Sequence, residues 1–144
     1  PRLGESPALT GIKHLGRLEQ VLARAEWDDP EIAEGLMLDI TNRPVEGTMS
    51  NLFVWRDGNL ITPGRCGVAG VMRGLVMETA REQGIPVQLR DLELDDLEQA
   101  EALFMTNSLI GIWPVRELEG RRFDPACIPN ALMEAAAAAA GFRG

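Results

Sequence analysis

One lysine is the first residue in this sequence whose type could carry chemistry. Thirteen of the fourteen Lys and Arg residues are Arg, so Lys13 supplies the only lysine amine. It ends the apolar stretch Leu9–Ile12 and precedes His14, the single histidine. A lysine amine becomes a nucleophile or a base when burial or a neighbouring charge lowers its pKa. The apolar neighbours make Lys13 a candidate for such chemistry, and a solvated surface lysine is the ordinary alternative.

A carboxylate at the edge of a predicted strand is the second candidate. Glu46 follows Val45 and precedes the small-residue segment Gly47–Ser50. A carboxylate at a strand end can simply face solvent. Its functional alternative is to be buried as the acceptor for a protonated ring nitrogen, which would keep the carboxylate ionised.

Two further segments could bind a phosphate. Gly70 opens a predicted helix within Val68–Arg73, and a helix that begins at a glycine offers backbone N–H groups and its positive dipole end to an anion. Thr106, Asn107 and Ser108 place three small hydrogen-bonding side chains at a strand end, where they could hold phosphate oxygens. A plain helix N-cap and an ordinary turn are the alternatives for these two segments.

Hydrophobic periodicity predicts the elements that must position these residues. Asp57-Gly58-Asn59 predicts a tight hairpin, and Gly84, with Pro86 beyond it, predicts a helix end. Hairpins are mixed among helices, so the order of elements predicts an α+β fold rather than a doubly wound sheet. The predicted helices cover 16–26, 70–83, 94–100 and 130–140, and the predicted strands cover 35–40, 45–48, 51–55, 60–62, 87–89, 103–107 and 110–115.

Two of the predicted helices have a recognisable apolar face. The helix over 16–26 is read as amphipathic because apolar residues recur at helical spacing; these are Leu15, Leu18, Leu22 and Ala25. The helix over 70–83 is expected to place a second set on one face; these are Val71, Leu75, Thr79 and Ala80.

Composition excludes several classes of protein. The 144 residues, of which 45% are hydrophobic and 25% charged, predict a globular domain. The net charge of -8 disfavours nucleic acid or an anionic membrane as the main partner. No apolar run approaches the roughly 18 residues of a membrane span. Cys66 and Cys127 lie far apart, so with one histidine neither a disulfide scaffold nor a zinc site is expected, and the cytoplasm is the expected compartment.

The candidate segments together resemble a known enzyme family. Residues 11–15 with 17–22 are similar to the lysine segment of the 4-amino-4-deoxychorismate lyases, which belong to the fold-type IV pyridoxal-phosphate (PLP) enzymes. Residues 46–53 resemble the glutamate strand of that family, residues 70–73 its phosphate helix, and Thr106-Asn107 with Trp113-Pro114-Val115 its second phosphate strand. Each motif alone is weak, but the four occur in the family order and at family-like spacing.

The resemblance implies roles around the cofactor ring. Lys13 would bind PLP covalently through its amine and then act as the proton-transfer base. Glu46 would pair with the pyridine nitrogen and keep it protonated, so that the ring serves as an electron sink. Val68 would lie against one face of the ring.

The resemblance also implies a phosphate site and a fold. The backbone N–H groups of Val71 and Met72 would hold the phosphate, with the side chain of Asn107, or of its neighbour Thr106, as a further ligand. The fold would be the large domain of the D-amino acid aminotransferase type, with a barrel-like mixed sheet and surrounding helices. Residues 1–144 would be this C-terminal PLP-binding domain, without the small N-terminal domain of the family.

The implied reaction converts 4-amino-4-deoxychorismate to 4-aminobenzoate, a folate precursor, and pyruvate. Lys13, as a free amine, would take the C4 proton, and loss of the enolpyruvyl group would aromatise the ring. A branched-chain or D-amino acid transaminase of the same fold is one alternative, and an inactive folded fragment is another. The stretch 13–20 favours the lyase, because aminotransferases of this fold often carry a tyrosine nearby and the chain has none.

Two departures from the family pattern affect these expectations. Gly16 stands where the lyases tend to have Asn, which affects how Lys13 and the cofactor would be oriented. The small N-terminal domain would supply an arginine to the phosphate and part of the substrate pocket. The resemblance implies a homodimer with the site near the subunit boundary, a small-molecule substrate, and no nucleic-acid or membrane partner.

Overall fold

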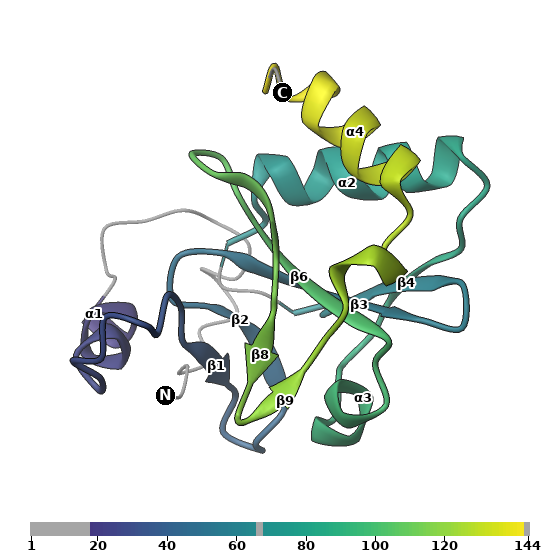
Figure 1. Cartoon of the computed structure of the whole chain (residues 1–144). Helices are drawn as coiled ribbons and strands as arrows, with labels where there is room; N and C mark the ends of the chain where they lie inside the picture. Colours follow the sequence, from purple (N-terminus) through teal and green to yellow (C-terminus); the bar gives the residue numbers. More distant parts are fainter. Residues whose placement is uncertain (1–17, 66–67, 143–144) are drawn as a thin grey trace.

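A central strand, β3, organises the sheet of this protein. The structure is a computed structural model that describes residues 18–65 and 68–142 (Figure 1). Its helices are α1 (Leu18–Arg24), α2 (Val71–Glu82), α3 (Leu94–Glu98) and α4 (Asn130–Ala139), with a 3-10 turn at Pro125–Cys127. Its strands are β1 (Leu36–Leu38), β2 (Pro44–Gly47), β3 (Asn51–Arg56), β4 (Asn59–Thr62), β5 (Val87–Leu89), β6 (Ala102–Asn107), β7 (Gly111–Pro114), β8 (Glu117–Leu118) and β9 (Arg121–Arg122).

The main sheet has seven strands, and β3 pairs with three others, β2, β4 and β6. β6 pairs with β3 from Asn51 to Trp55, so β2 and β4 must share the opposite edge of β3. β2 meets that edge at Asn51, and β4 meets it from Val54 to Arg56. Only the β4–β5 pair is parallel among the pairs of the described sheet. This mixed sheet with helices confirms the predicted α+β class.

The two faces of the sheet bury different cores because side chains alternate along a strand. Phe53 and Phe104 lie directly opposite each other on β3 and β6, with ring centroids 4.9 Å apart and planes inclined by 9°. They belong to the core beneath α2 and α4, which lie together above the sheet in Figure 1. Leu52 and Leu103 face the other core, which α3 and the β8–β9 hairpin cover.

Local signals for turns are confirmed. Asp57 and Gly58 form the two-residue hairpin loop between Arg56 and Asn59, with φ values of 50° and 73°. Positive φ at both positions is the geometry of a type I′ turn, which matches the twist of the flanking strands. Gly84, at φ 74°, follows α2 in the left-handed conformation that ends many helices.

The predicted faces of two helices are partly wrong. Leu18 and Leu22 on α1 are 67% and 59% exposed, because only Ala23 of this helix joins a hydrophobic cluster, with Met37 and Val45. The buried residues of α2 are Met72, Arg73, Val76, Thr79 and Ala80, whereas Val71 is 74% exposed. Thr79 and Ala80 of the predicted α2 face are therefore buried, and Val71 is not.

Two short strands near the carboxyl end, β8 and β9, were not predicted from the sequence. β8 and β9 form a two-stranded sheet through the turn at Glu119 and Gly120, which have φ values of 49° and 79°. Strands of two residues are too short for a period-2 pattern to be read. In the described ranges, 18–65 and 68–142, none of the helices has the length and apolar character that a membrane span requires.

An ion pair fastens α3 to the end of the sheet. The guanidinium of Arg90 donates two hydrogen bonds to the carboxylate of Asp96, at 2.7 and 2.9 Å. The hydrogen bond from Arg90 lowers the pKa of Asp96 below its ordinary value of 3.8, against the opposing effect of burial. Asp96 also accepts from the backbone N–H of Glu93 at 2.8 Å, which caps α3.

Shortening Phe104 to alanine tests the packing of the sheet under α2. Because the Phe53–Phe104 stack would be replaced by a cavity, Phe104→Ala should lower the free energy of unfolding by about 3–5 kcal/mol. Leu109→Ala is the control, since Leu109 is 88% exposed, and it should change stability by less than about 0.5 kcal/mol. Urea unfolding followed by circular dichroism measures both. Equal effects of the two substitutions would contradict the assigned core.

Asp96 should make stability depend on acid pH. Its folded-state pKa lies below the unfolded value of 3.8, so its contribution is complete above 3.8 and is lost as the pH falls through the folded-state pKa. The stability gap between wild type and Asp96→Asn should therefore be largest near neutrality and shrink in acid. Thermal unfolding across a pH series measures this, and a gap that is constant with pH would refute it.

Candidate functional site

Three buried polar residues form a row across the sheet. Glu46 on β2 is paired with Asn51 on β3, and Asn51 is paired with Thr106 on β6. Directly paired residues of neighbouring strands project to the same face, so the three side chains lie side by side. Their exposed fractions are only 2%, 6% and 1%. We call Glu46, Asn51 and Thr106 the polar row.

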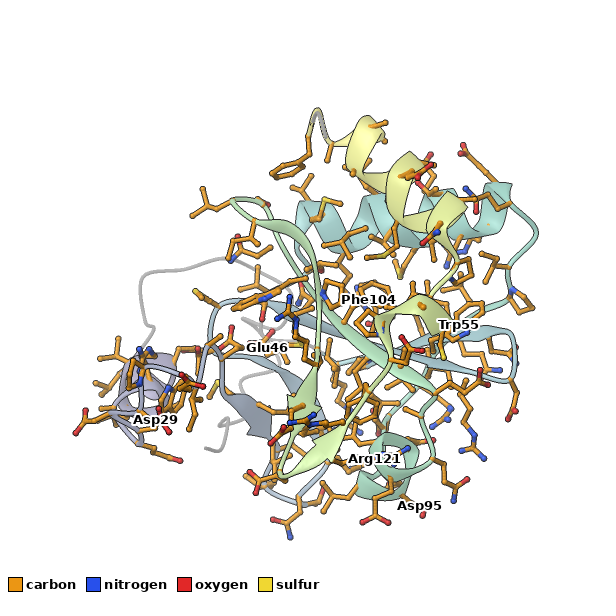
Figure 2. The ribbon with its side chains drawn as sticks, viewed as in Figure 1. Asp29, Glu46, Trp55, Asp95, Phe104 and Arg121 are labelled. Carbon is orange, nitrogen blue, oxygen red and sulfur yellow. The ribbon has the colours of Figure 1, made fainter. Side chains whose placement is uncertain are left out.

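The polar row continues the core face that lies beneath α2. Asn51 and Phe53 share one face of β3, and Phe104 and Thr106 share the same face of β6, because each pair is two residues apart. Figure 2 shows Glu46 toward one end of the sheet, with Phe104 and then Trp55 farther along it under α2 and α4. The face beneath the helices thus changes from aromatic to polar near the start of α2.

Asn51 connects the polar row to the segment that leads into α2. Its Nδ2 donates to the carbonyl oxygen of Val68 at 2.7 Å, and its Oδ1 accepts from the backbone N–H of Gly70 at 3.2 Å. A Cβ atom on Gly70 would collide with Oδ1 of Asn51, so a glycine is needed for this close approach. The start of α2 is consequently held against β3.

The N-terminus of α2 has the properties of an anion site. Gly70 is its N-cap residue, no side chain caps the helix, and its first turn holds no acidic residue. The first N–H groups of a helix lack intrahelical partners and carry the positive end of the dipole. Arg73, in the same turn, is buried and donates to the carbonyl of Pro63 at 2.8 Å; it forms no ion pair with any described carboxylate. This end of α2 is therefore electropositive.

Thr106 supplies an independent indication of a ligand. Its hydroxyl is buried and has no hydrogen-bond partner among the residues that the structure describes. Leaving a buried hydroxyl without a hydrogen bond costs about 1–3 kcal/mol of stability. Such hydroxyls are rare unless a bound molecule supplies the missing partner. The Thr106 hydroxyl next to Asn51 is thus suited to a phosphate at the start of α2.

Asn107 already has partners within the chain. Its Nδ2 donates to the carbonyl of Met49 at 2.8 Å, and its Oδ1 accepts from the N–H of Leu109 at 2.7 Å. These bonds fix the β6–β7 turn to the β2–β3 turn. Between the two neighbouring candidates for a phosphate ligand, the geometry favours the Thr106 hydroxyl over the Asn107 amide.

Glu46 lies close to the segment predicted to flank the ring. Its Oε2 accepts from the backbone N–H of Val68 at 3.3 Å, and its carboxylate is almost fully buried. The structure thus brings Glu46, Val68, Thr106 and the start of α2 together. Lys13 and Gly16 lie outside the described residues.

Two residues with contacts in the site, Glu34 and Asn51, were not identified from the sequence. Glu34 precedes β1, and its carboxylate accepts from the backbone N–H of Thr48 at 3.0 Å, from the Thr48 hydroxyl and from the Ser50 hydroxyl at 2.8 Å. It fixes the turn after Glu46, and no local pattern predicts this contact. Asn51 did carry a signal, because a polar residue begins an otherwise apolar strand on its inward face.

An apolar cleft lies on the opposite face of the sheet. It has a volume of about 950 Å³, and its lining includes Leu36, Leu52, Leu103 and Trp113. No member of the polar row lines the cleft, although Glu34, which fixes the turn after Glu46, does. Within the described ranges, no group of three or more His, Cys, Asp or Glu side chains is arranged to hold a metal ion.

The sequence of this chain matches a known protein family. The family described as amino-transferase class IV matches residues 2–118. A relative from Vibrio harveyi named aminodeoxychorismate lyase is 48% identical over 116 residues, which are 79% of this chain and 43% of that protein.

Solved structures give the same relationship. A 4-amino-4-deoxychorismate lyase from Pseudomonas aeruginosa matches with a TM-score of 0.85 and 48% identity, over 93% of this chain and 49% of that one. A branched-chain amino acid aminotransferase from T.th., complexed with N-(5'-phosphopyridoxyl)-L-glutamate, matches with a TM-score of 0.76 and 26% identity, over 88% of this chain and 44% of that one.

The extent of these matches defines what they establish. The chain spans about half the length or less of the relatives it matches. The family match covers most of the chain, and the Pseudomonas aeruginosa structure matches the fold of this chain over 93% of the chain's length. The chain therefore belongs to the class IV aminotransferase family, whose fold-type IV architecture it shares and for which PLP is the implied cofactor.

Proposed function

We propose that this chain is the cofactor-binding part of a PLP-dependent lyase that converts 4-amino-4-deoxychorismate to 4-aminobenzoate and pyruvate. The observation that carries the PLP site is the buried, unpartnered hydroxyl of Thr106 in the same row as Asn51, which holds the electropositive start of α2. The 48% identity to the Vibrio harveyi lyase supports the choice of reaction.

The phosphate of the cofactor would bind at the start of α2. The backbone N–H groups of Val71 and Met72 would donate to it, since a helix N-terminus is suited to a phosphate. Thr106 would donate its hydroxyl, which would remove the cost of leaving that group unsatisfied. Arg73 would add positive charge, because its guanidinium forms no ion pair with a described carboxylate. Asn107 would contribute by fixing the strand end.

The ring would lie between Glu46 and Lys13. The Glu46 carboxylate would accept a hydrogen bond from the protonated ring nitrogen, which compensates the cost of burying a charge. Val68, whose N–H is bonded to Glu46, would lie against the ring. Lys13 would hold the cofactor covalently, because no other lysine is available. Pyridoxal phosphate, when bound, supplies an electron sink for the charge that develops at substrate C4.

The residues of the chain would direct the reaction by moving one proton. Lys13 Nζ, released when the substrate amine takes its place, would accept the proton from C4 of the substrate. The bond between the ring carbon and the enolpyruvyl oxygen would then break as the ring becomes aromatic, and Lys13 would pass the proton to the methylene carbon of the departing group, which becomes pyruvate. A base must be placed within hydrogen-bond reach of the proton that it abstracts.

An aminotransferase acting on branched-chain amino acids is the second candidate. The branched-chain aminotransferase from T.th. supports it through the shared fold. The same Lys13 and Glu46 would serve, but the amino group would be returned to a keto acid. The higher identity to the lyases, 48% against 26% to 37% for the branched-chain aminotransferases, favours the elimination.

The organisation of the enzyme is part of the proposal. Residues 1–144 would form the C-terminal PLP-binding domain, and a small N-terminal domain would complete the substrate pocket. The active enzyme would be a cytoplasmic homodimer that contributes to folate synthesis.

Covalent loading of the lysine tests the cofactor assignment. Adding PLP to the purified chain should produce a visible absorption band, and borohydride should fix the cofactor on Lys13, as peptide mass spectrometry would locate it. Lys13→Ala should give neither result because it removes the only lysine amine. An unchanged band and a reducible adduct in Lys13→Ala would refute the role of this residue.

Product analysis separates the two reactions. We expect 4-aminobenzoate and pyruvate from aminodeoxychorismate, and no glutamate from a branched-chain amino acid with 2-oxoglutarate. Glutamate formation without 4-aminobenzoate would establish the aminotransferase instead. The assay should use the chain loaded with PLP.

Thr106→Val separates binding from folding. Valine has nearly the same shape without the unsatisfied hydroxyl, so the stability of the cofactor-free protein should stay equal or increase. The affinity for PLP should fall about tenfold, since a hydrogen bond to a charged group is worth about 1.5–3 kcal/mol. Thr79→Val, in the last turn of α2, is the control and should leave PLP affinity unchanged. Unchanged affinity in Thr106→Val would contradict the proposed phosphate ligand.

A further inference from the structure

We propose that Asn51 is a positioning residue that sets the start of α2 for phosphate binding. The inference rests on the proposed function, because it concerns the same PLP site. Asn51 would not contact the reacting atoms. It would act through the backbone groups of the segment Val68–Gly70, which joins the polar row to α2.

The segment before α2 is held at three points by the polar row. Asn51 donates to the carbonyl of Val68 at 2.7 Å and accepts from the N–H of Gly70 at 3.2 Å. Glu46 accepts from the N–H of Val68 at 3.3 Å. Both backbone polar groups of Val68 are therefore bonded to side chains of the row, and the N-cap of α2 is bonded to Asn51.

The use of a donor and an acceptor on one side chain explains why the residue is an asparagine. The planar amide places an NH₂ group and a carbonyl oxygen at opposite ends, so it can bond a C=O and an N–H of the same segment. Aspartate offers only acceptors when ionised and would face the Val68 carbonyl without a proton to donate. Leucine would leave both backbone groups unpaired.

The position of Gly70 determines where the phosphate-binding N–H groups lie. Gly70 accepts the first helical hydrogen bond, from the N–H of Gly74 at 3.1 Å, and so fixes the direction of the first turn. Val71 and Met72 follow it directly. Hydrogen bonds to phosphate require donor to acceptor distances near 2.9 Å, so a small displacement of Gly70 weakens both.

Comparing PLP with pyridoxal tests this role, because only PLP carries the phosphate. In Asn51→Ala and Asn51→Asp, PLP affinity should fall about tenfold to a hundredfold, the range expected when buried hydrogen bonds are lost. Pyridoxal affinity should change far less, and hydrogen exchange at the Gly70 amide of the cofactor-free variants should accelerate. Asn59→Ala is the matched control, because the Asn59 amide also bonds a backbone carbonyl, that of Asp57, but at the β3–β4 hairpin.

Each outcome decides the inference. A selective loss of PLP affinity with faster exchange at Gly70 supports it. Equal losses of affinity for PLP and pyridoxal would contradict the inference, because they would show that Asn51 supports the fold in general. Unchanged PLP affinity would refute the role of Asn51 while leaving the proposed function intact. If wild type does not prefer PLP to pyridoxal, the phosphate site itself fails and the inference falls with it.

Discussion

The register of β2 and β6 on β3 is the constraint on which the candidate site depends. Glu46, Asn51 and Thr106 face α2 only because they are directly paired across the three strands. A slip of one residue would turn a strand over, exchanging its inward and outward side chains. Such a slip at β6 would also remove Phe104 from its stack with Phe53, so the hydrophobic core specifies the register that the polar row requires.

The same face of the sheet serves stability at one end and binding at the other. Around Phe53 and Phe104 it is filled by apolar side chains from α2 and α4. Near the start of α2 it presents a carboxylate, an amide and a hydroxyl, and the hydroxyl of Thr106 has no partner in the described part of the chain. Burying these groups costs free energy, and a bound anion with its ring would offset that cost. Stability is thus given up where a ligand is expected.

Much of this architecture could be predicted from local sequence, and the rest could not for physical reasons. The hairpin at Asp57-Gly58 and the end of α2 at Gly84 follow from backbone preferences that act over a few residues. The exposure of Leu18 and Val71 could not be predicted, because a periodic pattern does not show which elements a helix packs against. The contact between Glu34 and the turn at Thr48 depends on the tertiary fold, as does the choice between Thr106 and Asn107. The role of Lys13 stays a prediction.

A crystal structure of the chain with bound PLP is the most direct test of the account. We expect the phosphate against the N–H groups of Val71 and Met72 and the hydroxyl of Thr106, with the ring nitrogen facing Glu46. Asn51 should keep both of its hydrogen bonds to Val68 and Gly70 in that complex. A phosphate bound elsewhere, for example in the apolar cleft beside Leu36 and Trp113, would contradict the central claim.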